Sequence, residues 1–211
     1  DCLVNNAGFG LFGALEDLSQ TQIRQQMEVN FFGLLFLTQT LLPLLRKNRG
    51  RILNISSVVG YMGLPFTSLY SSSKFALEGL TESLYYEAKP FGVQVCLIEP
   101  GQHRTDFGKK LIYGEKSFEP FSPYFRFSKK FKEFRESSRK KPGVPSSSVV
   151  DKIVLLSEKK TIPLHVPIGI DAKLSYYLKK LLPAGLFFTL MYKIFSAKFF
   201  KISTEAETQQ Y

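Results

Sequence analysis

The chain contains no tryptophan, only two cysteines and only two histidines among its 211 residues. Cys2 and Cys96 both fall in apolar stretches that read as buried strands, where a free thiol behaves as a small hydrophobic side chain. We therefore expect no disulfide, and a reducing, cytoplasmic compartment. His103 and His165 are predicted to be structural or surface residues, and the spacing of potential ligands shows no metal-ligand cluster.

Long apolar runs are also missing. No uninterrupted stretch reaches the roughly 18 apolar residues that a membrane-spanning helix needs. Hydrophobic residues still make up 44% of the chain, which is enough for one sizeable core. The composition therefore predicts one globular domain rather than a disordered chain.

Acidic side chains are scarce in two segments. The formal net charge is +10, but residues 1–108 hold 8 basic and 9 acidic side chains and are nearly neutral. The excess lies in residues 109–141, with 11 basic against 4 acidic side chains, and in residues 172–211, with 6 against 2. Any effect of the positive charge must therefore come from these two segments.

The stretch Arg51–Lys74 contains the residues best suited to chemistry. An apolar strand, Ile52–Ile55, precedes Ser57, a turn with Gly and Pro, and a helix on which Tyr70 and Lys74 are four residues apart and share a face. A nearby ammonium lowers the pKa of a phenol, which would let Tyr70 exchange protons near neutral pH while Ser57 holds an oxygen that Tyr70 protonates. Alone, Tyr-x-x-x-Lys is also a common solvated surface pair.

Three further stretches help to decide whether Tyr70 and Lys74 are catalytic or an ordinary surface pair. Asn5-Asn6-Ala7-Gly8 ends a short apolar strand, and Asn30 interrupts the apolar face of a helix predicted from Ser19 to about Asn48. A mid-helix asparagine costs helix propensity, so Asn30 is either functional or a buried amide bound to backbone. Pro100-Gly101-x-x-x-Thr105 follows a third predicted strand, Val93–Ile98, although Pro-Gly alone marks an ordinary turn.

Taken together and in this order, the motifs resemble those of the short-chain dehydrogenase/reductase family. The resemblance covers about Asp1–Phe107, and the stretch Gly63–Gly101 is most similar to the branch of 17β-hydroxysteroid and retinol dehydrogenases. It implies a Rossmann-type, doubly wound α/β fold with a mostly parallel sheet. It also implies hydride transfer between NAD or NADP and an alcohol or carbonyl.

The resemblance assigns a role to each motif. Tyr70 would be the general acid/base, Lys74 would lower its pKa and hold the nicotinamide ribose, and Ser57 rather than Ser56 would orient the substrate oxygen. Asn30 would lie at a helix kink and support proton relay through a water. The implied cofactor contacts are Asn6, Ala7, Gly8, Tyr70, Lys74, Pro100, Gly101 and Thr105.

The start of the family pattern is missing. Similar enzymes begin with a strand, a TGxxxGxG turn and a helix, roughly 70–80 residues before the NNAG motif, and this chain has neither these nor an initiating Met. We expect an N-terminally truncated piece that binds its cofactor poorly and is inactive alone; the residue that selects NAD or NADP is missing too. By analogy, the helices with Asn30 and Tyr70 would pair subunits in a homo-oligomer.

Residues 1–171 are predicted to form the catalytic domain, with residues 109–145 as a basic, aromatic insertion where similar enzymes carry a substrate lid. Its side chains suit an apolar steroid, retinoid or lipid-like substrate, or simply pack the lid on the sheet. A helix capped by Ser147 or Ser148 and a short edge strand, Ile162–Ile168, are predicted to follow. The apolar residues in and next to this region are Phe107, Ile112, Phe118, Phe121, Tyr124, Phe125 and Phe127.

Residues 172–211 are predicted to form two basic amphipathic helices, divided by Pro183, and a tail. Such helices usually pack on their own domain or on a partner subunit, which we favour. The alternative hypothesis is a weak, salt-sensitive contact with anionic membranes. A non-catalytic module that associates with membranes or nucleic acid through its basic segments is the competing function. We expect no nucleic-acid binding, because no such motif accompanies the charge.

Overall fold

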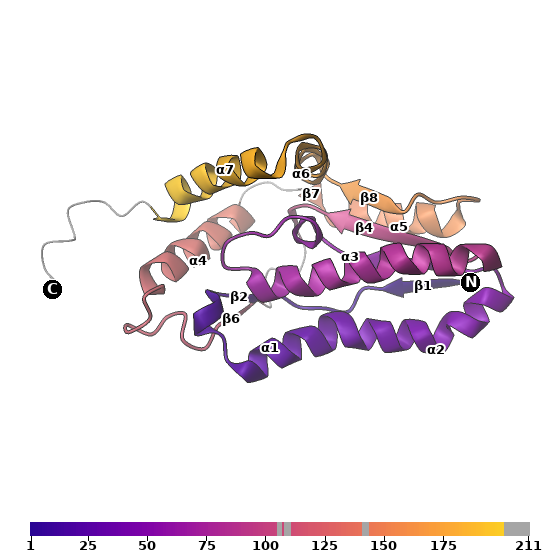
Figure 1. The fold of residues 1–211 in the computed structure, drawn as a ribbon, viewed down its shortest axis with the longest axis horizontal. Coiled ribbons are helices and arrows are strands. Elements are labelled where there is room, and N and C mark those ends of the chain that lie inside the picture. The colour runs from indigo at the N-terminus through magenta and orange to yellow at the C-terminus, as the bar shows by residue number, and fades with distance from the viewer. Residues whose placement is uncertain (105–106, 108–110, 141–143, 201–211) are drawn as a thin grey trace, which may run out of the picture.

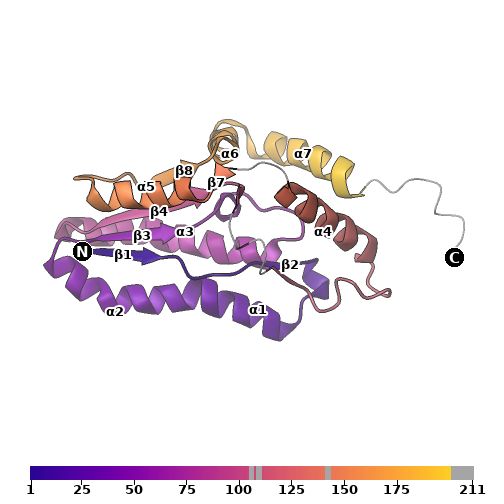
Figure 2. The same cartoon turned by 180° about the vertical axis from the view of Figure 1, so that it is seen from behind.

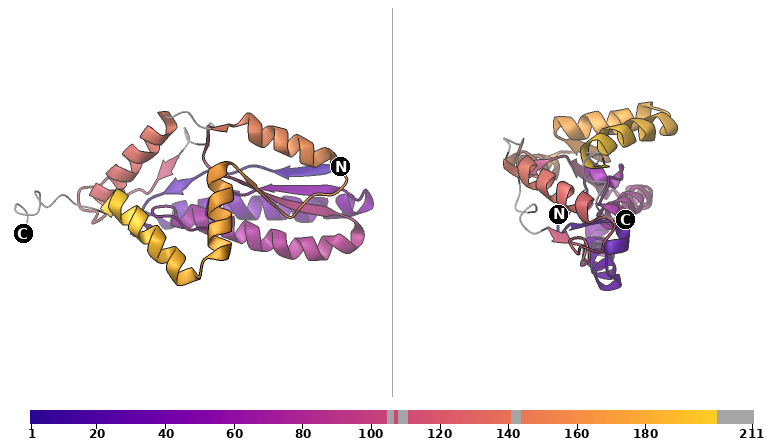
Figure 3. Two further views of the ribbon diagram at one scale, coloured as in Figure 1. Left: turned by 90° about the horizontal axis from the view of Figure 1, so that it is seen from above. Right: turned by 90° about the vertical axis from the view of Figure 1, so that its left-hand side faces the viewer.

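A parallel sheet of four strands organises the computed structural model, which describes residues 1–104, 107, 111–140 and 144–200 (Figure 1). The strands are β1 (Cys2–Asn5), β3 (Arg51–Ile55), β4 (Gln94–Pro100) and β8 (His165–Ile168), paired in the order β1-β3-β4-β8. Helices lie on both faces of this sheet (Figures 2 and 3). The predicted Rossmann-type α/β fold is confirmed, including the position of β8 at an edge.

Two long helical segments cover one face of the sheet. The first runs from α1 (Gln20–Met27) through a π-helical turn (Glu28–Phe32) into α2 (Gly33–Lys47), and the second is α3 (Ser68–Ala88). Alternate strand residues point to this face. The buried side chains there include Leu45, Ile52, Leu84 and Val95, with Leu34, Leu77 and Leu97 beside them.

The opposite face of the sheet is covered by α5 (Ser147–Glu158). Leu53 and Cys96, the neighbours of the residues that face α2 and α3, pack here against Leu156. Burial raises the pKa of the Cys96 thiol to about 12, so it is inert. The prediction that Cys2 is buried is wrong: β1 is an edge strand in the described residues, and Cys2 is exposed.

The start of α1 agrees with its sequence pattern. The Ser19 hydroxyl accepts a hydrogen bond from the Gln22 amide, and the Gln22 side chain accepts one from the Ser19 amide, which forms a capping box. The start of α5 differs from the prediction. The residue preceding it is Ser146, whose side chain makes no capping hydrogen bond, and Ser147 is already its first residue.

The helical segment Gln20–Lys47 is long and apolar enough, by length and composition, to cross a membrane. It contains no uninterrupted apolar run of that length, because polar residues are interspersed along it. Its buried polar side chains bind neighbouring segments: Gln26 accepts from the Leu11 amide (2.8 Å), and Asn5 donates to Thr38 (2.9 Å). These contacts indicate a helix that belongs to the folded domain.

The described part of the basic insertion contains a short strand and a long helix. It includes β6 (Ile112–Tyr113), which pairs with β2 (Leu11–Phe12), and α4 (Phe125–Lys140). A second small pair joins β5 (His103–Arg104) to β7 (Val144–Pro145). The C-terminal part then forms α6 (Ile170–Leu181), α7 (Ala184–Phe195) and a π-helical turn, Ser196–Phe200, as an outer layer (Figure 3, left).

Candidate active site

The carboxyl ends of β1, β3 and β4 meet at one edge of the sheet, where open α/β folds bind their ligands. Asn6, Ala7 and Gly8 follow β1 and are exposed. Ser57 follows β3, and its hydroxyl accepts a hydrogen bond from the Val59 amide (3.4 Å), which fixes the turn in which it lies. The structure therefore brings the predicted motifs to the same edge.

Buried amides connect this edge to the helices. The Asn5 side chain donates to Asn54 (2.7 Å) as well as to Thr38, and Asn54 donates to Thr81 of α3 (2.8 Å). Asn5 thus binds side chains rather than the neighbouring backbone. No sequence pattern indicated a role for Asn54, because its partners are far away in the chain.

Asn30 lies fully buried in the π-helical turn between α1 and α2. Its side-chain oxygen accepts from the Phe9 amide (3.0 Å), and its amide group donates to the Phe9 carbonyl (2.9 Å) and to the Ser73 hydroxyl (3.3 Å). A π-helical turn is a common cause of a kink in a helix, and this one lies where the resemblance implies a kink. The interpretation as a buried amide bound to backbone is confirmed, and the same amide links the NNAG segment to α3. The role in proton relay stays a prediction.

Tyr70 and Ser57 are hydrogen-bonded to each other through their side chains. Only 8% of Tyr70 is exposed, and burial raises the pKa of its phenol to about 12, although the bond with Ser57 and the charge of Arg135 oppose this rise. The sequence predicted a lowered pKa. That prediction is wrong for this structure, because the loss of hydration outweighs the favourable contacts of the phenolate.

Lys74 lies one helical turn beyond Tyr70 and is 6% exposed. Its ammonium donates to the Ile55 carbonyl at the end of β3 (2.7 Å). Burial lowers the pKa of Lys74 to about 8, and the negative charge that Glu78, another turn along α3, carries when ionised opposes that change. At neutral pH the ammonium therefore keeps its proton and fixes α3 to the strand that presents Ser57.

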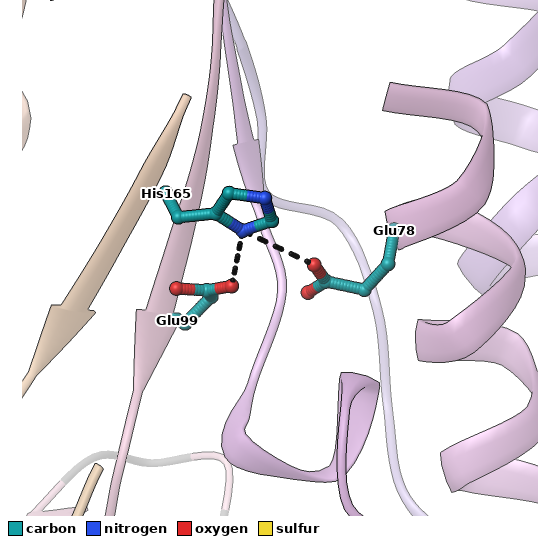
Figure 4. A group of neighbouring side chains, drawn as sticks. All are labelled: Glu78, Glu99 and His165. Carbon is teal, nitrogen blue, oxygen red and sulfur yellow. Dashed lines mark hydrogen bonds and ion pairs between the residues drawn. The ribbon is translucent and has the colours of Figure 1, made fainter. Parts of the chain in front are cut away.

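Glu78 belongs to a buried group that the sequence did not reveal (Figure 4). His165 Nδ1 lies 2.9 Å from Glu99 Oε1 and 3.8 Å from Glu78 Oε2, and the three residues come from β8, β4 and α3. His165 is thus a structural residue, as predicted, yet it joins three potential ligands where the spacing showed no cluster. Nothing else among the described residues indicates a cation there.

The carboxyl group of Glu78 also holds the segment next to Ser57 in place. Ser56 donates a hydrogen bond to Glu78 Oε1, and a Cβ atom at Gly60 would lie 2.7 Å from that oxygen, so only glycine fits. Burial and the charge of Glu99 raise the pKa of Glu78 to about 8. Glu78 therefore keeps its proton at neutral pH.

An aromatic cluster covers Tyr70. The rings of Phe12 and Phe107 lie 5.7 and 5.5 Å from the Tyr70 ring, and Phe131 of α4 packs on Phe12 at 5.9 Å. Arg135, also on α4, places its guanidinium 5.2 Å from the Phe12 ring centroid. The sequence missed Arg135, and its place in the basic insertion was the only available signal. Phe127, Tyr124 and Phe107 pack on this cluster, whereas Phe121 is 73% exposed.

An open hollow of about 470 Å³ lies beside this cluster. It is bounded by residues 14–16, Pro65 and Phe66, Tyr124 and Phe200, of which Glu16 alone is charged. Phe66 belongs to the same buried cluster as Tyr70. The hollow is large enough for a small ligand and is mainly apolar.

The Pro100-Gly101 turn has a neighbour that the sequence did not suggest. A Cβ atom at Gly101 would lie 2.2 Å from Asp171 Oδ1, and the same carboxylate accepts from the Gln102 amide (2.6 Å). The close approach that requires glycine is therefore to Asp171. Thr105, the last predicted cofactor contact, and the tail residues 201–211 lie outside the described residues.

Comparison with known proteins shows which family the chain resembles. Residues 1–116 match the family model for short chain dehydrogenase. The uncharacterized oxidoreductase YusZ of Bacillus subtilis is 40% identical over 186 residues, which cover 87% of this chain and 66% of that protein. Human 17-beta-hydroxysteroid dehydrogenase type 1 is 41% identical over 149 residues, 66% of this chain and 45% of that protein.

A solved structure is similar over more of the chain. A short chain dehydrogenase from Burkholderia cenocepacia in complex with NADP superposes with a TM-score of 0.67 at 25% identity, and the match covers 90% of this chain and 68% of that one. The chain thus spans under two thirds of the length of the two curated relatives and a similar share of this structure. Because the family model covers more than half of the chain, the chain belongs to the short-chain dehydrogenase family.

Proposed function

We propose that the protein containing this chain interconverts an alcohol and a carbonyl with NAD or NADP. The observation that carries the proposal is the hydrogen-bonded pair of hydroxyls, Ser57 and Tyr70, at the carboxyl edge of the sheet with the Lys74 ammonium one helical turn away. The membership of the family and the NADP in the Burkholderia structure support it.

The residues at the sheet edge suit a dinucleotide cofactor. Asn6, Ala7 and Gly8 are exposed directly after the buried Asn5, which leaves their backbone groups accessible to a ligand. Tyr70 and Lys74 lie on α3 at the same edge. When bound, the nicotinamide supplies or accepts a hydride.

The protein's own groups handle the proton. Because the pKa of Tyr70 is about 12, its phenol carries a proton at neutral pH and can give it to a carbonyl oxygen. The Ser57 hydroxyl, bonded to the phenol, is placed to position that oxygen. Lys74 holds α3 against the end of β3, which keeps the two hydroxyls in register.

We further propose that the substrate is apolar, of the steroid, retinoid or lipid class. The hollow beside Phe66, its nearly uncharged lining and the steroid dehydrogenase among the relatives support this proposal. A panel of steroid, retinol and short polar carbonyl substrates tests it. Preference for the polar compounds would overturn the apolar assignment without affecting the reaction class.

The reaction class is tested by Tyr70→Phe in the whole protein. Loss of the proton donor should reduce turnover by about 10²–10⁴-fold. Tyr86→Phe is a matched control on the same helix, because the Tyr86 side chain is 71% exposed and far along α3 from Tyr70. Turnover by Tyr70→Phe equal to that of the control would contradict the assignment.

We also propose that the protein forms homo-oligomers through α2 and α3. Phe36 and Leu44 of α2 and Phe75 of α3 are 53%, 52% and 42% exposed, a large apolar surface on neighbouring helices. Phe36→Glu should shift the sedimentation coefficient of the whole protein toward that of the monomer. An unchanged coefficient would place the interface elsewhere.

A further inference from the structure

The helices α6 and α7 expose an apolar surface on the outside of the molecule. On α6 the side chains of Ile170, Leu174 and Leu181 are 85%, 59% and 79% exposed, and their spacing places them on one face. On α7 Leu186, Leu190 and Ile194, four residues apart, are 56%, 41% and 50% exposed. Figure 3 (left) shows the two helices meeting in a V that forms an outer layer of the molecule. These six residues define the α6–α7 face.

Different side chains attach these helices to the domain. Ala172 and Phe187 are 0% and 2% exposed. The Tyr61 hydroxyl donates to the Ala172 carbonyl (2.9 Å), and the Lys179 ammonium donates to the Tyr61 carbonyl. The predicted packing on the domain is therefore correct for one side of the helices, while the α6–α7 face points away from it.

The charged side chains of α6 and α7 beyond Asp171 are all positive. Five lysines and no acidic residue lie between Ala172 and Phe200. Lys173 and Lys180 are exposed, and their spacing places both along one border of the apolar side chains of α6. The nearest acidic residue in the chain, Asp171, is engaged by the Gln102 amide.

We propose that the α6–α7 face docks on the surface of an anionic lipid bilayer. Apolar side chains bordered by lysines match the interface between acyl chains and anionic headgroups. A second copy of this chain is a poorer match, because it would place lysines opposite lysines. The sheet order also puts β8 and α6 at the edge opposite β1, so a strand added beside β1 does not cover this face.

The α6–α7 face is directly connected to the candidate active site. α7 continues into the turn that carries Phe199, which is 2% exposed and whose ring lies 5.7 Å from that of Phe131 in the cluster around Tyr70. Phe200, the next residue, lines the open hollow. An apolar substrate dissolved in the bilayer would therefore meet the hollow close to the docked surface.

Co-sedimentation of the whole protein with vesicles tests the proposal. We expect binding to phosphatidylcholine vesicles that contain phosphatidylserine, little binding to phosphatidylcholine alone, and weaker binding at high salt. The double variant Leu181→Glu, Leu190→Glu should reduce binding about tenfold or more. Val150→Glu with Val154→Glu on α5 is the matched control, because these side chains are also exposed, at 55% and 49%, and four residues apart.

Several results would overturn docking on lipid. One is no binding to phosphatidylserine vesicles at low salt, and another is equal binding by the two double variants. A third is dissociation of an oligomer by Leu181→Glu with Leu190→Glu in sedimentation velocity, together with absent vesicle binding. That result would show that the α6–α7 face binds another copy of the chain. Turnover with a soluble substrate is measured separately, so failure of docking leaves the proposed reaction standing.

Discussion

Replacement of Glu78 by Gln should change how the stability of the protein depends on pH. The pKa of Glu78 is raised to about 8, whereas a free glutamate titrates near ~4.3. The folded state therefore holds this proton more tightly than the unfolded state. Its contribution to stability is complete below pH ~4.3 and is lost as the pH rises toward 8. Gln cannot ionise, so the variant should keep this stability across the window.

The size of the effect follows from the width of that window. Each pH unit in it is worth about 1.4 kcal/mol for one proton, which puts the loss between pH 5 and pH 8 at roughly 2–4 kcal/mol. His165 also has a raised pKa, mainly through its hydrogen bond with Glu99. Its contribution to the stability of the folded state therefore also falls as the pH rises, in the wild type and in the variant. The Glu78→Gln curve should thus be flatter, though not flat. The pKa of Lys74 is lowered to about 8, so its titration adds to the stability of the folded protein only above that pH.

Urea unfolding of the whole protein at several pH values between 5 and 8 measures the difference. Glu82→Gln is the control, because Glu82 lies one turn further along α3, 3.5 Å from His165, with a side chain 53% exposed. Parallel curves for the wild type and Glu78→Gln would refute the reasoning. An equal flattening by Glu82→Gln would assign the pH dependence to His165 instead.

Three further substitutions test other contacts. Asn30→Ala leaves the Phe9 amide and carbonyl without their partner and should lower the unfolding free energy by about 1–3 kcal/mol, read from urea unfolding. Phe199→Ala removes a buried ring from the aromatic cluster and should cost about 3–5 kcal/mol by the same assay, and a loss near zero would contradict its burial. Arg135→Met removes a charge that lowers the pKa of Tyr70, so the alkaline limb of the pH–turnover profile should move to higher pH; an unmoved limb would separate Arg135 from Tyr70.

Local patterns were sufficient to predict much of the fold. The three apolar strands, the start of a helix at Ser19 and the helix that carries Tyr70 and Lys74 each depend on neighbouring residues, so the sequence contains their cause. The meeting of Ser57 with Tyr70 was predictable for a similar reason, since a single turn connects the strand to the helix. The length of α4 was also within reach, because Phe127, Phe131 and Phe134 recur at helical spacing.

Contacts between distant segments were not predictable in this way. Glu78, Glu99 and His165 come from three elements, and only the strand order makes them neighbours. The direction of the Tyr70 pKa depends on burial by Phe12, Phe107 and their neighbours, which the spacing of Tyr70 and Lys74 does not express. The exposure of Cys2 likewise depends on which strand lies at the edge of the described sheet.

Asn30 shows why a structural and a catalytic interpretation of one residue need not compete. Its amide binds both backbone groups of Phe9 and thereby fixes the segment that follows Asn6, while Gly8 allows close approach because a Cβ atom there would lie 3.2 Å from Asn30 Oδ1. The same amide reaches Ser73, whose hydroxyl donates to the Tyr70 carbonyl (2.8 Å). One buried side chain therefore sets the position of the proposed cofactor edge relative to the proposed proton donor. A loss of Asn30 should disturb stability and catalysis together, because both depend on the same hydrogen bonds.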